Sequence, residues 1–231
     1  MALTPQNDEA FLREVDEELR REQLTSLWRR YGRIGIGAVM VLLAAFAGFL
    51  FWQAETEKKA GERGEAMSAA LHDIQAGRKA DAQVKLSQLA EGSGGYKASA
   101  LFAKAALAAD SGDKKGAAAL YEAVARDESA PQPYRDLAVI RQTAVEYDMM
   151  KPQAVVDRLK PLAVRGNPWF GTAGELTAAA FLDMKRPRDA GQMLATIAED
   201  PQVPPSLRGR AARLAAALGA DVETPVTAQK D

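Results

Sequence analysis

The sequence predicts an all-α fold, in which a single N-terminal transmembrane helix precedes an α-solenoid of about four degenerate helical hairpins and a C-terminal capping helix. Three observations support this prediction. An uncharged apolar run covers residues 34–54. The rest of the chain is rich in alanine and lacks the runs of Val, Ile and Thr that form strands. Four stretches of that remainder also repeat one pattern of small and large apolar residues.

The apolar run has the length and flanks of a membrane anchor. No charged residue occurs between Arg33 and Glu55. A helix of this length spans roughly 31 Å, and the hydrocarbon core of a bilayer is about 30 Å thick. The run is apolar on every side, so it has no polar stripe to face water. Trp28, Tyr31 and Trp52 flank it, where aromatic rings prefer the headgroup level.

Two alternatives to an anchor are a buried soluble helix and a cleaved signal peptide. A buried helix of a soluble domain can be equally apolar, but such helices usually run about 10 to 14 residues. A cleaved signal peptide has an A-x-A site available at Ala45-Phe46-Ala47. Cleavage there would expose the apolar segment 48–52, and the charged region before the run is longer than a signal peptide needs. The sequence therefore favours an uncleaved anchor.

The charges beside the anchor predict its orientation. Arg29, Arg30 and Arg33 crowd its N-terminal edge, whereas Glu55 and Glu57 come first on the far side. Because positive residues near a membrane helix stay in the cytoplasm, we expect the N-terminus inside and residues 55–231 outside.

Residues 1–33 are predicted to form a cytosolic amphipathic tail. Phe11, Val15 and Leu19 lie four apart, with charged residues between them. This helix either lies at the membrane surface or docks a cytosolic partner. After the anchor, residues 55–66 are charged and favour helix, and they are predicted to form a stalk.

Residues 67–219 are predicted to form the repeat domain. Each of the four stretches has a turn, a small or branched residue, a larger apolar residue four positions on, another three later, and a break with Gly or Pro. Such a stripe buries one face of a helix against its neighbour. The twelve apolar anchors are Ala82/Leu86/Leu89, Ala117/Tyr121/Val124, Val155/Leu159/Leu162 and Ala190/Leu194/Ile197, and their first members are 35, 38 and 35 residues apart.

The last predicted helix follows Pro204-Pro205, with Ser206 as its N-cap, and ends at Gly219. It is predicted to cap the solenoid, because Arg208, Arg210 and Arg213 would solvate its outer face. Residues 220–231 are predicted to be disordered.

The sequence offers no constellation for catalysis. Cysteine is absent, which rules out disulfides and thiolate metal sites, and His72 is the only histidine. Outside the tail and its flanking arginines, residues 34–231 hold 24 basic and 24 acidic side chains, so they offer no charge footprint for nucleic acid. We therefore expect no enzymatic activity, no metal or other cofactor, and no small-molecule substrate.

Aromatic residues suggest where a protein partner binds. They fall on or near the first helix of each predicted hairpin, where they either pack between repeats or line a groove for an extended peptide or a partner helix. Four residues are predicted to line such a groove, namely Tyr134, Arg135, Arg141 and Trp169. The full set of aromatics is Tyr96, Phe102, Tyr134, Tyr147, Trp169, Phe170 and Phe181.

The period and the small residues resemble the tetratricopeptide repeat. That unit has 34 residues, small residues where its two helices cross and an aromatic on its second helix. The second repeat is most similar to it, with Ala105 and Ala108 on the first helix, Gly112 in the turn, and Ala117 and Tyr121 on the second helix. The other three repeats lack the aromatic. The first also has Asp73 near a position that is usually aromatic in this repeat.

The whole layout resembles the YfgM-like family of ancillary translocon subunits. The resemblance covers the chain from about Asp8 to Leu218, with "LWRRYGR" and "FWQAE" framing the anchor and "NPWFGTAGELTAAAFLDMKRPRDA" in the fourth repeat. It implies a scaffold in the bacterial inner membrane, beside the Sec translocon, that passes exported proteins to periplasmic chaperones. A membrane-anchored peptidyl-prolyl isomerase would be a companion.

Two alternatives to this function stay open. The first is a tethered repeat scaffold for cell-envelope assembly, in division or outer-membrane biogenesis, without contact to the translocon. The second is a structural homo-oligomer packed through the anchor, where Ala44 and Gly48 supply a small-xxx-small face.

Overall fold

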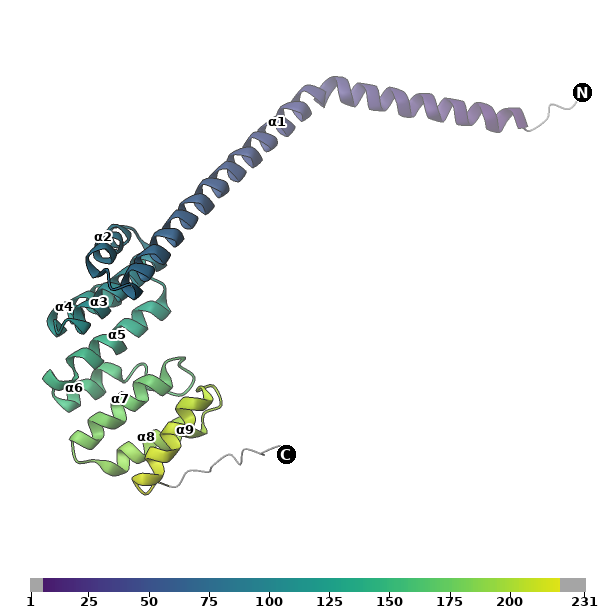
Figure 1. The fold of residues 1–231 in the computed structure, drawn as a ribbon. Coiled ribbons are helices and arrows are strands. Elements are labelled where there is room, and N and C mark those ends of the chain that lie inside the picture. Colours follow the sequence, from purple (N-terminus) through teal and green to yellow (C-terminus); the bar gives the residue numbers. More distant parts are fainter. Residues whose placement is uncertain (1–5, 221–231) are drawn as a thin grey trace, which may run out of the picture. The chain divides into compact units, whose positions relative to one another are not determined.

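The computed structural model describes the backbone of residues 6–220 and the side chains of residue 34 and residues 36–220. Over this range the secondary structure is entirely helical, as Figure 1 shows, so the predicted all-α fold is confirmed. The chain divides into two units, Met1–Glu62 and Arg63–Asp231, which we describe separately. Residues 221–231, for which disorder was predicted, lie outside the described range.

The first unit consists of helix α1 (Gln6–Gln75) as far as Glu62. The helix includes the predicted tail from Gln6 onward, although the side chains of Phe11, Val15 and Leu19 lie outside the described residues. From Ile36 it is long and apolar enough to cross a membrane, judged by length and composition, and no protein covers its most apolar part. This finding is consistent with a single-pass anchor and contrasts with a buried core helix.

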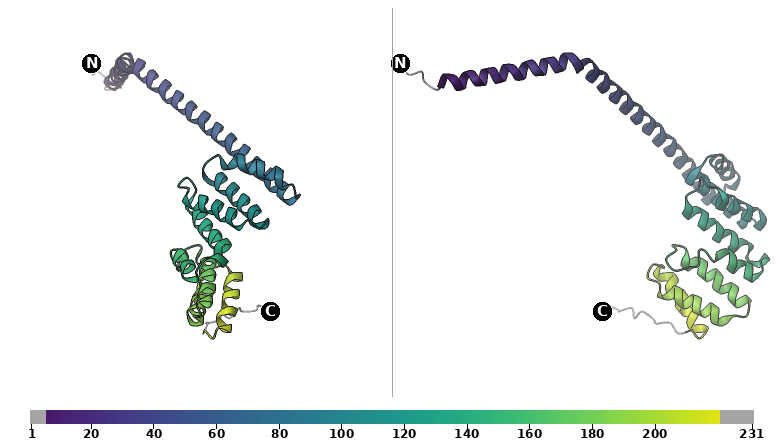
Figure 2. Two further views of the ribbon diagram at one scale, coloured as in Figure 1. Left: turned by 90° about the vertical axis from the view of Figure 1, so that its left-hand side faces the viewer. Right: turned by 180° about the vertical axis from the view of Figure 1, so that it is seen from behind.

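The second unit begins with the last turns of α1 and stacks two-helix hairpins in chain order (Figures 1 and 2). Each helix packs against the next, and α3, α5, α7 and α9 also contact one another in sequence. We call the end of α1 and α3, α5, α7 and α9 the first helices, and α2, α4, α6 and α8 the second helices. The bounds are α2 (Lys79–Ala90), α3 (Gly94–Asp110), α4 (Lys114–Arg126), α5 (Gln132–Glu146), the 3-10 turn η1 (Tyr147–Met149), α6 (Pro152–Leu159), α7 (Phe170–Asp183), α8 (Pro187–Glu199) and α9 (Pro205–Ala217).

All twelve predicted apolar anchors are buried, each with at most 8 % of its surface exposed. Their small first members, Ala82, Ala117, Val155 and Ala190, are completely buried. Small side chains at these positions let two helix backbones approach closely, and each larger anchor contributes roughly 1.5 to 3 kcal/mol by leaving water. The sequence pattern therefore located the buried stripe of each second helix, with the difference that Leu162 is buried three residues beyond the end of α6.

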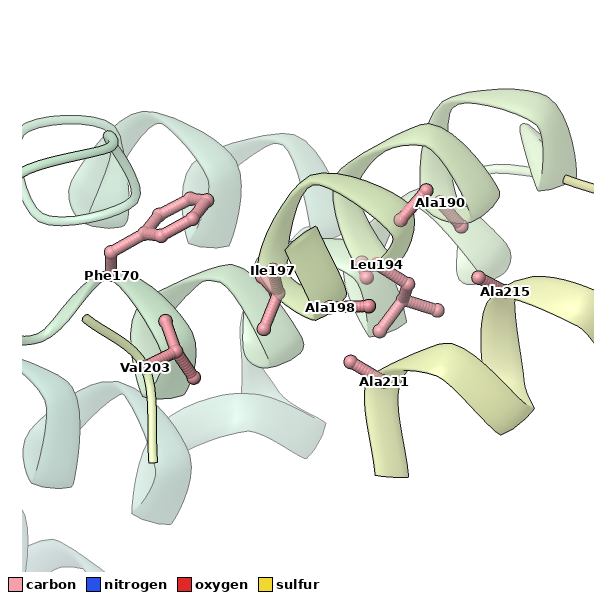
Figure 3. Packing of buried hydrophobic residues seen from close by; sticks show 10 residues of the cluster. Phe170, Ala190, Leu194, Ile197, Ala198, Val203, Ala211 and Ala215 are labelled. Atoms are coloured by element: carbon pink, nitrogen blue, oxygen red, sulfur yellow. The ribbon is translucent and has the colours of Figure 1, made fainter. Parts of the chain in front are cut away.

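The core is a series of four apolar clusters, each built from three consecutive helices. Figure 3 shows the last one, in which Phe170 from α7, Leu194 and Ile197 from α8, and Ala211 and Ala215 from α9 come together. Each hairpin thus buries its apolar face only against its neighbours, as expected for a solenoid.

All first helices except α5 end in one recurring turn, in which a residue of positive φ follows the helix. This residue is Gly77 (φ 77°), Gly112 (φ 85°), Lys185 (φ 60°) or Gly219 (φ 74°). The backbone N–H of the next residue donates to the carbonyl five positions earlier, at 2.8 to 3.0 Å. Since α9 ends in this turn, it has the form of a first helix.

The predicted start of α9 at Ser206 is wrong by two residues. Pro204 is the N-cap and Pro205 is the first helical residue, and the Ser206 side chain makes no capping hydrogen bond. Proline has no N–H to leave unsatisfied and its φ suits the first helical position, so the pair Pro204-Pro205 starts the helix by itself.

Three connections between hairpins share a second kind of turn. The side-chain oxygen of Asp127, Asn167 or Asp200 accepts a hydrogen bond from the backbone N–H two residues later, at 2.8 to 2.9 Å. The residue after that is buried, and its N–H donates to the carbonyl of the same Asp or Asn. The buried residues are Ala130, Phe170 and Val203.

Candidate protein-binding surface

The first helices form a continuous surface, here called the first-helix face, because α3, α5, α7 and α9 lie side by side. Polar contacts join neighbouring first helices. The Tyr147 hydroxyl donates to Asp183 at 2.7 Å, and Arg210 donates to Glu175 at 2.7 Å. Burial and the Asp183 carboxylate raise the pKa of Tyr147 above its ordinary value, so the phenol keeps its proton and acts as the donor.

Tyr134 lies in the first turn of α5 and packs into the cluster shared with α3 and α4. Its ring centroid is 6.3 Å from that of Phe102, which in turn lies 5.4 Å from Tyr121. Tilted aromatic pairs at such distances stabilise packing between helices. Of the two alternatives given for the aromatics, packing between repeats is thus seen for Tyr134, whose half-buried side chain leaves part of its surface exposed.

The two predicted arginines differ in exposure and in the contacts that their side chains make. Arg135 is half-buried, donates to the side-chain oxygen of Gln132, and has a buried Nε without a partner. Arg141 is exposed and forms no ion pair with any described side chain. Its charge lies close enough to the Tyr121 hydroxyl to oppose the rise in pKa that burial causes there. Arg141 can therefore meet an anionic group of a partner without losing an existing contact.

Trp169 is the N-cap residue of α7, and its backbone N–H donates to Asn167. Its ring is half-buried in the cluster that α5, α6 and α7 share. The structure thus brings Tyr134 and Arg135 together on one turn of α5 and puts Trp169 in a different cluster. Neither of the pockets described below includes any of the four predicted residues, so their joint role in binding stays a prediction.

Two pockets lie beside α8, and neither was predicted from the sequence. One has a volume of about 370 Å³ and an apolar wall of Phe170, Phe181 and Met193; the other, of about 380 Å³, lies between α8 and the end of α9. Gln192 and Thr196 line both pockets, so the pockets flank one ridge of α8. Gln192 and Thr196 are polar and lie four apart on α8, but no sequence signal indicated a hollow beside them.

Asp73 occupies its unusual position for an electrostatic reason. The side chain is only 4 % exposed, and it accepts hydrogen bonds from Lys85 and from Arg78, whose Nε lies 3.0 Å away. Lys85, followed by Arg78, holds the pKa of this carboxyl below its usual range. The ion pairs join the end of α1 to α2. In more regular repeats, an aromatic side chain at this position joins the two helices by packing.

A stack of helical hairpins with an exposed first-helix face defines a helical repeat scaffold, a class of protein that binds other proteins. The chain belongs to a family with this architecture: the family model described as tetratricopeptide repeat-like domain matches residues 25–192. The match begins before the apolar run and ends within α8. No curated protein and no solved structure matches the chain.

Proposed function

We propose that this protein is a membrane-tethered scaffold of the Sec translocon that receives exported proteins and passes them to periplasmic chaperones. The observation that carries the proposal is the combination of one apolar helix, able to span a membrane, with a tetratricopeptide repeat-like domain on the same chain. The resemblance to YfgM-like translocon subunits is the reason for proposing the Sec translocon and periplasmic chaperones in particular. A membrane-anchored peptidyl-prolyl isomerase would accompany the scaffold.

The proposed topology has a cytosolic tail (1–33), a transmembrane segment (34–54), a stalk (55–66) and a periplasmic repeat domain (67–219). The arginines before the anchor support this orientation. Tethering keeps the first-helix face at a high effective concentration near the membrane exit site, so individually weak contacts can suffice.

Within that domain, Tyr134, Arg135, Arg141 and Trp169 are the proposed partner-binding residues. Arg141 gives the clearest test, because it is exposed and forms no ion pair with the side chains that the structure describes. We expect Arg141→Glu to weaken partner recovery while the thermal unfolding midpoint stays unchanged. Lys115→Glu reverses an equally exposed charge on the second helix α4 and is the matched control.

The deciding experiment is affinity recovery of the intact protein from native membranes in mild detergent, with mass spectrometry of the accompanying proteins. Translocon channel subunits together with periplasmic chaperones are the expected result. Recovery of division or outer-membrane assembly proteins without the channel would instead favour a cell-envelope scaffold. Recovery of the protein alone, also after crosslinking in living cells, would contradict both.

Orientation is tested separately. Because the chain contains no cysteine, a single introduced cysteine reports on one site only. Ala2→Cys should resist a membrane-impermeant thiol reagent in intact cells from which the outer membrane has been removed, whereas Ala216→Cys should react. The opposite pattern would place the repeat domain in the cytosol and overturn the proposed topology.

A further inference from the structure

The third hairpin differs from the other hairpins at both of its ends. Helix α6 has 8 residues, whereas α2, α4 and α8 have 12 or 13. The recurring turn with a residue of positive φ is missing after α5, which continues directly into the 3-10 turn η1. Ten residues (160–169) then separate α6 from α7, whereas the corresponding connections elsewhere cover 91–93, 127–131 and 200–204.

This irregularity weakens the packing in the middle of the repeat domain. Helix α5 packs extensively on α4 but makes little contact with α6. The contacts that cross this junction are mainly apolar, in the cluster where Ile140 of α5 lies with Val155 and Leu159 of α6 and Ala173 of α7. Apolar contacts have no preferred direction, so helices joined by them can repack in a second, shifted arrangement without losing a specific bond.

Directional contacts at the junction are few and lie near the surface. Glu146 at the end of α5 pairs with Arg158 of α6, and their side chains are 23 % and 34 % exposed. The Tyr147 hydroxyl donates to Asp183 at the end of α7. Hydrogen bonds and ion pairs depend on geometry, so these two contacts set the angle at which α5 meets the helices that follow.

We propose that the third hairpin is a hinge within the repeat domain, on which residues 63–146 and residues 152–217 turn as two bodies. The Ile140 cluster is the pivot, and the Glu146–Arg158 and Tyr147–Asp183 contacts are latches that hold one angle. Close-packed interfaces have discrete arrangements, so release of the latches favours a second angle rather than a gradual bend. The inference concerns the protein alone and does not depend on which partner it binds.

Turning at this hinge would change the spacing of the predicted binding residues. Tyr134, Arg135 and Arg141 lie on the first body, and Trp169 lies between α6 and α7 on the other side of the junction. A partner that spans both bodies would therefore select one angle, and a partner that contacts only one body would not.

The absence of cysteine makes the hinge measurable by pulsed electron paramagnetic resonance with paired nitroxide labels on the full-length protein in detergent. Cysteines for the labels are introduced at four exposed sites, two sites at a time. Ala119 and Ala216 report across the hinge, Gln83 and Ala119 report within the first body, and Thr172 and Ala216 report within the second.

We expect the distance distribution across the hinge to be broader than both of the others. The double variant Glu146→Gln, Tyr147→Phe should broaden it further or shift it to a second distance, with the other two distributions unchanged. Asp183→Ala should act in the same direction, because it removes the acceptor of the Tyr147 hydrogen bond. Glu122→Gln removes an ion pair within α4 and is the matched control that should change none of the distributions.

Equal widths for all three pairs, unaffected by the substitutions, would overturn the hinge. If the distance distribution across the hinge is broad but the same in wild type and in both latch variants, the assignment of the latches is wrong. Loss of helical circular dichroism in a variant would mark unfolding, and Asp183→Ala provides the independent route to the same contact in that case.

Discussion

Lys185 has a left-handed backbone conformation, and at the equivalent turns of the other helices glycine occupies this position. Its φ is 60°, whereas Gly77, Gly112 and Gly219 supply the positive φ elsewhere. A left-handed conformation costs a side-chain-bearing residue roughly 1 to 2 kcal/mol, and glycine gives part of this back through its freer unfolded state. We expect Lys185→Gly to raise the free energy of unfolding by about 0.5 to 1 kcal/mol, measured by urea denaturation.

The reverse substitution is the control for this prediction. Gly112→Ala puts a Cβ at φ 85° with no neighbouring atom within 4 Å, so any loss comes from the backbone alone. It should lower the free energy of unfolding by about 1 kcal/mol. If both variants unfold at the wild-type urea concentration, the turn conformation carries no cost and our explanation is wrong.

Asp127 provides a prediction on pH dependence. Hydrogen bonds from Lys97 and then from Ser129 lower the pKa of this carboxyl from 3.8 to about 2. Because the folded group is the stronger acid, its contribution to stability is complete above pH 3.8 and is lost as the pH falls through about 2. Asp127→Asn should therefore destabilise the protein at neutral pH.

The Asp127→Asn variant keeps the turn, since Asn167 forms the same turn between α6 and α7. Only the ion pair with Lys97 disappears. The difference in urea midpoint between variant and wild type should shrink between pH 4 and pH 2. Asp157→Asn is the control, because Asp157 is exposed and forms no ion pair within the described part of the chain. A difference that persists unchanged at pH 2 would show that charge is not the cause.

At the scale of the elements, the contact of α7 with α8 depends on Gly174. A Cβ at this position would lie 2.7 Å from Cδ1 of Ile197, which is completely buried. Overpacking of a core costs roughly 1 to 3 kcal/mol, and the better helix propensity of alanine offsets up to about 1 kcal/mol. We expect Gly174→Ala to lower the free energy of unfolding by about 1 kcal/mol.

Gly95→Ala is the matched control in α3, because nothing lies within 4 Å of its Cβ. It should leave the urea midpoint unchanged or raise it slightly. A neutral Gly174→Ala variant would mean that Ile197 can move aside at no cost, and that the two helices are less closely packed than their contacts indicate.

The sequence predicted the regular part of these elements and missed the irregular part. The buried stripe of every second helix followed from a period of small and large apolar residues, because burial acts on each hairpin in the same way. The period carried no information on the burial of Asp73, the positive φ of Lys185 or the short length of α6. A buried ion pair, a left-handed lysine and a 3-10 turn depend on neighbours that become close only after folding, so periodicity could not reveal them.

The candidate binding residues were predictable in position but not in their surroundings. Sequence placed Tyr134, Arg141 and Trp169 on or beside first helices, where they lie. It could not tell that the Tyr134 and Trp169 rings enter different core clusters, because this depends on which way each ring points in the turn that begins its helix. The pockets beside α8 arise between elements, and a one-dimensional pattern contains no information on such gaps.

At the scale of the whole molecule, the apolar helix is long enough to attach the repeat domain to a membrane. Leu42 and Leu43 lie near the middle of residues 34–54 and are exposed. An arginine at the centre of a membrane helix costs roughly 3 kcal/mol on insertion scales. We expect the double variant Leu42→Arg, Leu43→Arg to leave the membrane fraction after an alkaline wash.

Val84→Arg is the control, since Val84 is 61 % exposed on the repeat domain and the substitution leaves the apolar helix intact. This variant should stay with the membranes. If the double variant also remains there after the wash, residues 34–54 are not what attaches the protein.

The four core clusters also determine the order in which the chain can become stable. Each cluster is completed by three consecutive helices, so none needs a residue from the far end of the molecule. A chain that emerges from N- to C-terminus, from a ribosome or from a pore, can close its first cluster as soon as α3 is free, and then add one cluster per hairpin. Folding can thus keep pace with synthesis or translocation, and little apolar surface of the repeat domain waits uncovered for the last residues to arrive.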